Sequence, residues 1–274
     1  MMSEIGESDL VRPAVVFSPH PDDETLGCGG TIIRKRRMGA EVTIVFMTDG
    51  SRSHRHLISE EELKSIRERE ALAASLVLGV DEKDLIFLEF KNGKLDENRE
   101  LAISKVTDIL TDRKPEEVFI PYYKEPSSWS EDHSATNRIV ISSLQIYGKR
   151  VIIYEYPIGF WCHWPWVSRR QIRSRREVLN VLKECFSSGL SMLKDFRHSV
   201  NIEEVLEIKH AALDQYKSQM TRLISDPQWQ TLPNFSNGEF LACFFQPREI
   251  FRKYALNDAS IEFSGYKQNY FLGG

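Results

Sequence analysis

The chain has 274 residues, and 41% of them are hydrophobic, so it can bury a sizeable core. A formal net charge of -4 and a pI near 6.0 exclude a general electrostatic attraction to nucleic acid. No stretch approaches the ~18 apolar residues of a membrane span, and the polar stretch 1–12 has no apolar core typical of a secretory signal. The four cysteines are far apart and form no CxxC pair, so we expect a cytoplasmic protein without a disulfide framework.

Short β-branched and aromatic runs alternate with helical patterns through the first half of the chain. The predicted strands cover 14–17, 42–47, 85–90, 118–121 and 151–156. The predicted helices cover 24–37, 101–110 and 134–146, together with a segment that begins after the N-cap Ser59 and ends at Gly79. This alternation predicts an α/β fold with a mostly parallel sheet that is covered by helices on both faces.

The second half of the chain has a different composition. Residues 168–196 are basic and irregular, residues 202–224 predict one long helix, and the tail is rich in aromatic residues. The sequence therefore predicts a single domain over 1–274. Its core would cover about 14–160, and a C-terminal helical and aromatic-rich elaboration would cover about 161–274.

One imidazole and three carboxylates stand together in the stretch Ser18-Pro19-His20-Pro21-Asp22-Asp23-Glu24, between the predicted strand 14–17 and the helix that follows. In open α/β sheets, ligands bind at the carboxyl ends of the strands, which is where these side chains would point. A second cluster, Ser130-Glu131-Asp132-His133, lies after the strand 118–121. The two clusters occupy equivalent positions, and they meet if the two strands are neighbours.

A metal site follows from this arrangement. His20, Asp23 and His133 can then converge on one cation, and two imidazoles with one carboxylate and an open position form the ligand set of hydrolytic zinc. Iron(II) accepts the same nitrogen and oxygen ligands. Asp22 would be free to act as a base on metal-bound water.

A structural explanation is also open. A histidine and an aspartate at a turn commonly cap a helix, and Asp22 and Asp23 are favourable near a helix N-terminus. Three adjacent carboxylates repel one another unless a cation or a positive helix end compensates, so the complete string favours the metal site. Gly27, Gly29 and Gly30 could cradle a dinucleotide phosphate, but the preceding carboxylates would repel it. We therefore predict that these glycines allow close packing of the helix on the sheet.

The stretch from Ser18 to Gly30, with the letters SPHPDDETLGCGG, resembles the signature of the PIG-L/LmbE family of zinc-dependent N-acetylglucosamine deacetylases. The string Thr48-Asp49-Gly50, the string Arg67-Glu68-Arg69-Glu70-Ala71 and the pair Ser218-Gln219 agree with the same family. The resemblance implies a Rossmann-like fold. It also implies hydrolysis of an N-acetyl group from a glucosamine unit, which releases acetate and a free amine.

The resemblance implies roles for individual residues as well. His20, Asp23 and His133 would bind zinc. Asp22 would be the general base, and Arg67 would contact the sugar or its substituent.

Two positions depart from the pattern of the family. The family usually has a histidine three positions before the third metal ligand, and this histidine stabilises the oxyanion while an intervening aspartate orients it. Here the position is Ser130 and the intervening aspartate is Asp132, so we assign both residues a supporting role. Losing one oxyanion donor can reduce the rate roughly 100-fold or more. His163 could replace this donor, but a structural histidine is the favoured explanation there. The other departure is Tyr216, where the family commonly has histidine.

We therefore expect a metal-dependent hydrolase that removes the N-acetyl group from a small N-acetylglucosamine-containing conjugate and has no nucleic acid partner. Two alternatives are open. One is a metal-dependent amidohydrolase acting on another small N-acyl compound. The other is a non-catalytic, metal-stabilised carbohydrate-binding protein, which Ser130 favours. The sequence identifies neither the group attached to the sugar nor the oligomeric state.

Overall fold

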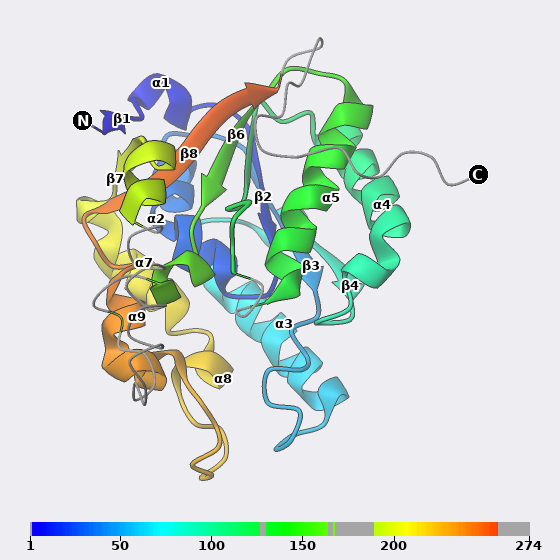
Figure 1. Cartoon of the computed structure of the whole chain (residues 1–274), viewed down its shortest axis with the longest axis vertical. Helices are drawn as coiled ribbons and strands as arrows, with labels where there is room; N and C mark the ends of the chain where they lie inside the picture. Colours follow the sequence, from blue (N-terminus) through cyan, green and yellow to red (C-terminus); the bar gives the residue numbers. More distant parts are fainter. Residues whose placement is uncertain (1, 127–129, 164–166, 168–188, 257–274) are drawn as a thin grey trace.

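Within the described residues, which are 2–126, 130–163, 167 and 189–256 of the computed structural model, eight strands form one sheet (Figure 1). The strands are β1 (Ser3–Glu4), β2 (Ala14–Ser18), β3 (Val42–Thr48), β4 (Leu85–Phe90), β5 (Glu117–Pro121), β6 (Val151–Tyr156), β7 (His198–Asn201) and β8 (Arg248–Leu256). The α-helices are α1 (Glu7–Leu10), α2 (Asp23–Arg37), α3 (Glu60–Val77), α4 (Arg99–Arg113), α5 (Glu131–Tyr147), α7 (Leu206–Leu213), α8 (Lys217–Met220) and α9 (Glu239–Ala242). Short 3-10 helices are η1 (Glu82–Asp84), η2 (Asp96–Asn98), η3 (Gly159–His163), η4 (Glu203–Val205) and η5 (Leu232–Gly238).

The sheet is parallel at its centre. Strands β2 to β6 run in one direction, and β8 is antiparallel to its neighbours β6 and β7. The strand order is β1-β7-β8-β6-β5-β2-β3-β4, so the chain moves from β2 outward to β3 and β4 and then returns to the other side of β2 with β5. The position between β2 and β5 is therefore a topological switch point, where the carboxyl ends of parallel strands form a natural ligand site.

Helices cover both faces of the sheet. Side chains alternate along β2, because Ala14 and Val16 join one buried cluster whereas Val15 and Phe17 join the other. The first cluster contains apolar residues of α2, α3 and α7, and the second contains those of α4 and α5. In Figure 1, α4 and α5 lie on one side of the strands, and α2 and α7 lie on the other.

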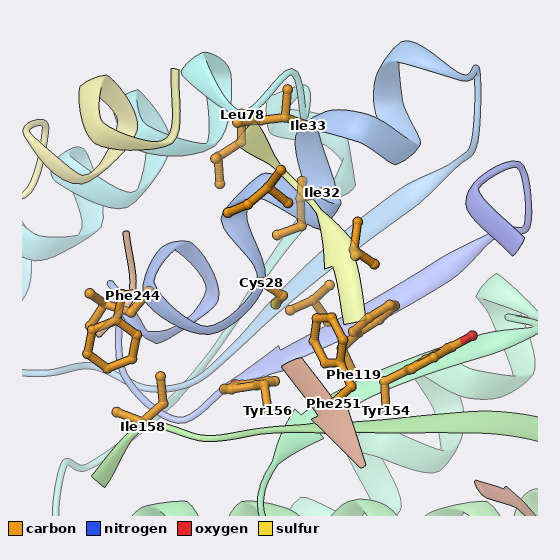
Figure 2. Close-up of a cluster of buried hydrophobic side chains, with 14 of the residues drawn as sticks. Cys28, Ile32, Ile33, Leu78, Phe119, Tyr154, Tyr156, Ile158, Phe244 and Phe251 are labelled. Atoms are coloured by element: carbon orange, nitrogen blue, oxygen red, sulfur yellow. The ribbon is translucent and has the colours of Figure 1, made fainter. Parts of the chain in front are cut away.

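The first buried cluster also connects the C-terminal region to the sheet (Figure 2). Cys28 and Ile32 of α2 lie in this cluster with Phe119 of β5, Tyr154 of β6 and Phe251 of β8. The rings of Phe119 and Tyr154 are stacked with their centroids 4.8 Å apart, and the ring of Phe251 meets Phe119 edge-on at 5.5 Å. Both geometries are favourable for aromatic pairs, so these rings stabilise the attachment of β8.

The predicted α/β architecture is confirmed. Strands β2 to β6 have bounds close to those expected, and the sheet is mostly parallel with helices on both faces. Ser59 caps α3 as predicted, since its side chain accepts a hydrogen bond from the Glu62 N–H at 3.2 Å. Across the described ranges, every helix is too short or too polar to span a lipid bilayer.

The predicted long helix over 202–224 is wrong. The segment is divided, because α7 ends at Leu213 and α8 begins only at Lys217. Between them, Tyr216 has a ψ of 64°, which is not helical, and its hydroxyl donates a buried hydrogen bond to Glu24 at 2.6 Å. The C-terminal elaboration, predicted to be helical and rich in aromatic residues, also contains two strands, β7 and β8, which extend the sheet.

Candidate active site

Three side chains from the two predicted clusters converge at the switch point between β2 and β5. His20 follows β2, Asp23 begins α2, and His133 lies in the first turn of α5. His20 Nδ1 and His133 Nε2 lie 3.1 Å and 3.2 Å from the same atom, Asp23 Oδ2. One potential ligand atom from each residue lies within 4.8 Å of the other two. The two strands are neighbours, as the sequence interpretation required.

The three side chains fit a divalent metal ion. Asp23 and His133 are buried, and both ring nitrogens of His133 lack a hydrogen-bond partner within the described residues. Leaving buried polar atoms unpaired is unfavourable, and a cation bound to Nε2 would satisfy one of them. Two imidazoles and one carboxylate also leave an open fourth position around a tetrahedral ion.

Asp132, in the first turn of α5, contacts the ring of His20. Its Oδ2 lies 3.1 Å from His20 Nε2, whereas the other ring nitrogen faces Asp23. The same carboxylate accepts hydrogen bonds from the backbone N–H of Gly93 at 2.6 Å and of Leu95 at 3.3 Å. Burial raises the pKa of Asp132, but the bonds from His20 and the two amides outweigh burial, so the pKa lies below its ordinary value. The carboxylate therefore stays ionised and can fix the orientation of a metal-binding imidazole.

Asp22 lies beside this group in a strained backbone conformation. Its φ of 123° is in a region that residues other than glycine rarely adopt. Two hydrogen bonds hold it there, because Asp22 N–H donates to Glu24 Oε2 at 3.1 Å and Arg67 Nη2 donates to Asp22 Oδ2 at 2.9 Å. Burial raises the pKa of Asp22 to about 8, although the Arg67 guanidinium acts in the opposite direction. Backbone strain of about 1–3 kcal/mol at one residue is typical of functional sites.

Arg67 binds the turns that follow two neighbouring strands. The residue is only 3% exposed, and besides Asp22 it donates hydrogen bonds to the carbonyl oxygens of Pro21 and Gly50. Gly50 leaves room for the guanidinium, because a Cβ at that position would lie 2.9 Å from Arg67 Nε. This Nε has no hydrogen-bond partner among the described residues. The contact of Arg67 with a substrate stays a prediction.

Glu24, the third carboxylate of the string, is buried among hydroxyl donors. Its Oε1 accepts hydrogen bonds from the hydroxyls of Tyr216 and Thr25, each at 2.6 Å, and its Oε2 accepts one from Ser18 at 3.1 Å. Burial raises the pKa of Glu24 above its ordinary value, although the bonds from Thr25 and Tyr216 act in the opposite direction. Tyr216, one of the two departures from the family pattern, therefore connects the C-terminal region to the turn that carries the site.

Ser130, the other departure, is the N-cap of α5. Its side chain accepts a hydrogen bond from the Asp132 N–H at 3.2 Å, as serine does at many helix N-termini. This bond holds the start of the helix, where Asp132 and His133 lie. The sequence leaves His163 open both as a replacement for the oxyanion histidine and as a structural histidine, and its side chain lies outside the described residues. The supporting roles of Ser130 and Asp132 in catalysis stay predictions.

Gly27 and Gly30 allow close packing, as predicted, whereas a Cβ at Gly29 would make only ordinary contacts at 3.4 Å. A Cβ at Gly27 would lie 2.3 Å from the ring of Tyr156, and a Cβ at Gly30 would lie 2.6 Å from Ile202. Neither approach leaves room for a side chain. These glycines therefore let α2 lie directly on β6 and on the segment before α7.

The backbone amides of this glycine-rich turn bind a carboxylate of the chain itself. Helix α2 is interrupted at Cys28, and Glu249 of β8 accepts hydrogen bonds from the N–H groups of Gly30 and Thr31, each at 2.8 Å. Lys209 Nζ donates to the same carboxylate at 2.8 Å. The sequence interpretation did not include Glu249 or Lys209, and their pairing explains how the second part of α2 begins after the interruption.

The sequence interpretation also did not include Glu125. Its Oε2 lies 4.0 Å from His133 Nδ1, and its side chain is fully buried. Burial raises the pKa of Glu125 to about 7, although the nearby His133 acts in the opposite direction. The available signal was its position, because a carboxylate soon after the strand 118–121 lies at the same edge of the sheet as the other site residues.

The chain is similar in sequence to proteins that are named as deacetylases. Residues 15–144 match the family model PIG-L, which is described as GlcNAc-PI de-N-acetylase. A relative from Bacillus cereus, a probable N-acetyl-alpha-D-glucosaminyl L-malate deacetylase 2, is 28% identical over 211 residues, which are 74% of this chain and 90% of the relative. The diacetylchitobiose deacetylase of Thermococcus kodakarensis is 31% identical over 139 residues, which are 50% of this chain and 51% of that protein.

A solved structure has the same fold. The N,N'-diacetylchitobiose deacetylase of Pyrococcus horikoshii superposes with a TM-score of 0.61 at 23% identity, and the match covers 89% of this chain and 84% of that chain. The segment that matches the PIG-L model contains the motif after β2 and the residues His20, Asp23 and His133. The resemblance to the PIG-L/LmbE family that the motifs indicated is confirmed for residues 15–144, which match the family model.

Proposed function

We propose that the protein is a cytoplasmic, metal-dependent hydrolase that removes the N-acetyl group from an N-acetylglucosamine-containing conjugate, releasing acetate and a free amine. The observation that carries the proposal is the convergence of His20, Asp23 and His133 beside Asp22 at the switch point of the sheet. The names of two relatives, an N-acetylglucosaminyl malate deacetylase and a diacetylchitobiose deacetylase, support an acetylated amino sugar as the substrate class.

His20, Asp23 and His133 would hold the metal ion. Zinc is the first assignment, and iron(II) is the alternative that the same donor atoms accept. When bound, such an ion polarises the amide carbonyl and lowers the pKa of a coordinated water to about 7. Asp132 would keep the His20 ring in its orientation through the 3.1 Å contact with Nε2, which leaves Nδ1 on the side of Asp23.

Asp22 would move the proton. It would take a proton from the attacking water and return it to the nitrogen of the departing amine, so one carboxylate serves first as base and then as acid. The strained backbone and the contact with Arg67 keep this carboxylate next to the proposed ligands. A pKa that burial raises toward neutrality suits a group that must both accept and donate a proton. Arg67, which binds Asp22, would contact the sugar or its substituent.

Ser130 favours a second candidate function. This residue stands where the family usually has the oxyanion histidine, and its side chain accepts the N-cap hydrogen bond of α5. Loss of one oxyanion donor can reduce a rate roughly 100-fold or more. A non-catalytic, metal-stabilised carbohydrate-binding protein is therefore the second candidate.

The test is the release of free amine from a panel of N-acetylglucosamine conjugates by metal-loaded protein, with Asp22→Asn as the matched control. Release that disappears in the control would support the proposal and rank the substrates. Release only from other N-acyl compounds would replace the substrate class. Stoichiometric binding of metal and sugar without turnover would favour the second candidate.

A further inference from the structure

Glu125 lies between β5 and α5, and its carboxylate faces the proposed metal ligand His133. Its Oε2 is 4.0 Å from His133 Nδ1, and the exposed fractions of the two side chains are 0% and 1%. The other ring nitrogen, His133 Nε2, lies 3.2 Å from Asp23 Oδ2. The imidazole of His133 is therefore placed between two buried carboxylates, one on each nitrogen.

Two backbone amides hold the Glu125 carboxylate in this position. The N–H of Ile158 donates to Oε1 at 2.7 Å, and the N–H of Phe160 donates to Oε2 at 3.1 Å. Both donors belong to the segment after β6, which packs beside the connection from β5 to α5. The carboxylate is thus held by the segment after β6, and its oxygens keep further acceptor capacity for the imidazole.

The 4.0 Å separation is longer than a hydrogen bond, and His133 has no hydrogen-bond partner on either nitrogen within the described part of the chain. A movement of the ring by about 1 Å would bring Nδ1 and Oε2 to hydrogen-bond distance. The two groups already face each other in a buried space.

His20, the other proposed histidine ligand, already has a carboxylate within hydrogen-bond distance of each ring nitrogen. His20 Nδ1 contacts Asp23 Oδ2, and His20 Nε2 contacts Asp132 Oδ2, both at 3.1 Å. Metal-binding histidines almost always donate their second N–H to a carboxylate, a carbonyl or water, and this bond fixes the tautomer and raises the basicity of the ligand. Asp132 can serve His20 in this way, and the corresponding partner of His133 is Glu125.

We propose that Glu125 is a positioning residue for the metal site. It accepts a hydrogen bond from His133 Nδ1 when Nε2 binds the metal ion, and thereby strengthens metal binding. This inference rests on the metal site of the proposed function. Glu125 acts through His133 and does not touch the substrate.

The experiment measures zinc binding to the metal-free full chain by competition with a chromophoric chelator, for the wild type, Glu125→Gln and Glu125→Ala. Removal of such an outer partner typically weakens metal affinity about 10-fold to 100-fold, which is the expected result for Glu125→Ala. We expect a smaller loss for Glu125→Gln, because its neutral amide oxygen can still accept the bond from His133. Glu249→Gln is the matched control, since Glu249 is also a buried carboxylate that accepts two backbone N–H bonds. We expect its zinc affinity to equal that of the wild type.

Thermal unfolding with and without zinc separates positioning from a purely structural role. A positioning residue makes the zinc-induced rise in Tm smaller in both Glu125 variants, whatever the Tm of the metal-free protein. A structural residue lowers both Tm values by the same amount and leaves the zinc affinity unchanged, and that result would overturn the inference. If Glu125→Ala does not fold, the isosteric Glu125→Gln decides by the same two measurements. Absence of zinc binding in the wild type would instead overturn the metal site itself.

Discussion

Asp22 and Arg67 form a buried ion pair, in which Oδ2 and Nη2 are 2.9 Å apart. The pair joins the turn after β2 to helix α3, and it lies next to the proposed metal ligand Asp23. Arg67 also binds the carbonyl oxygens of Pro21 and Gly50, so it holds the turns that follow both β2 and β3. The proposed base is therefore positioned by a group from another element as well as by its own strained turn.

Asp22→Asn should abolish amide hydrolysis and leave metal binding intact. Asparagine has nearly the same shape and can still accept the bond from Arg67, but it cannot take a proton from water. General acid–base groups contribute about 100-fold to 10,000-fold to a rate, so we expect a loss in this range. The measurement is free-amine release by zinc-loaded protein, with the zinc content determined on the same sample. Full activity in the variant would rule out Asp22 as the base.

His133→Ala should remove both metal binding and hydrolysis. The substitution deletes one of three proposed ligands, and the remaining pair of His20 and Asp23 offers too few protein ligands for a catalytic zinc site. The measurement is the zinc dissociation constant of the metal-free variant, compared with that of Asp22→Asn. A variant that binds one zinc ion per chain with the affinity of the wild type would show that the metal lies elsewhere.

Metal binding should tighten as the pH rises. In the metal-free protein, burial lowers the pKa of His20, but hydrogen bonds with Asp132 and Asp23 outweigh burial and raise the pKa to about 10. His20 is therefore protonated from about pH 6 to pH 8, and it must lose that proton when its nitrogen binds a metal ion.

The apparent dissociation constant for zinc should therefore fall about tenfold for each unit of pH rise in this range. Chelator competition at several pH values measures it, and release of a proton can be checked by calorimetry in buffers of different ionisation enthalpy. An affinity that is independent of pH would contradict a metal ion bound to His20.

The meeting of the two polar clusters could be predicted from the sequence. Apolar runs that alternate with helices indicated parallel strands, and polar residues after 14–17 and 118–121 indicated a site at the end of each. The structure brings His20, Asp23 and His133 together because those strands are β2 and β5, which pair directly. The roles of these residues in binding and catalysis stay predictions.

The remaining features depend on contacts between distant segments, which leave no local pattern. Tyr216 and Glu24 are 192 positions apart, and their hydrogen bond accounts for a break that apolar periodicity could not indicate. Glu125 could be seen to follow a strand, but a charged residue in a connection is usually solvated. Its burial against His133 depends on the segment after β6, which supplies the amide donors.

Tyr216→Phe should lower the free energy of unfolding by about 1–3 kcal/mol, because Glu24 would stay buried and lose one of its hydroxyl donors. Urea unfolding of the metal-free protein measures the change. Tyr147→Phe is the control, because Tyr147 is partly exposed at the end of α5 and we expect little effect there. Equal stability of Tyr216→Phe and the wild type would show that the bond to Glu24 makes no net contribution.

Gly27→Ala should destabilise the protein by about 1–3 kcal/mol, the usual effect of overpacking a tight core. The new Cβ would lie 2.3 Å from the Tyr156 ring, whose hydroxyl donates a hydrogen bond to the carbonyl of Phe17 at 2.7 Å. Either the Tyr156 ring shifts and its hydroxyl loses this hydrogen bond, or the first turn of α2, which carries Asp23, moves. We therefore expect a lower Tm and weaker zinc binding together.

The control for this substitution is Gly189→Ala, since a Cβ at Gly189 would meet no atom within 4 Å. Alanine favours helices over glycine by about 1 kcal/mol, so helix propensity alone would make Gly27→Ala stabilising. The sign of the change in Tm thus decides between propensity and packing. A Gly27→Ala variant that melts at a higher temperature than the wild type would mean that Tyr156 can move aside without loss, and the metal-site turn would then be less tightly packed on β6 than the structure shows.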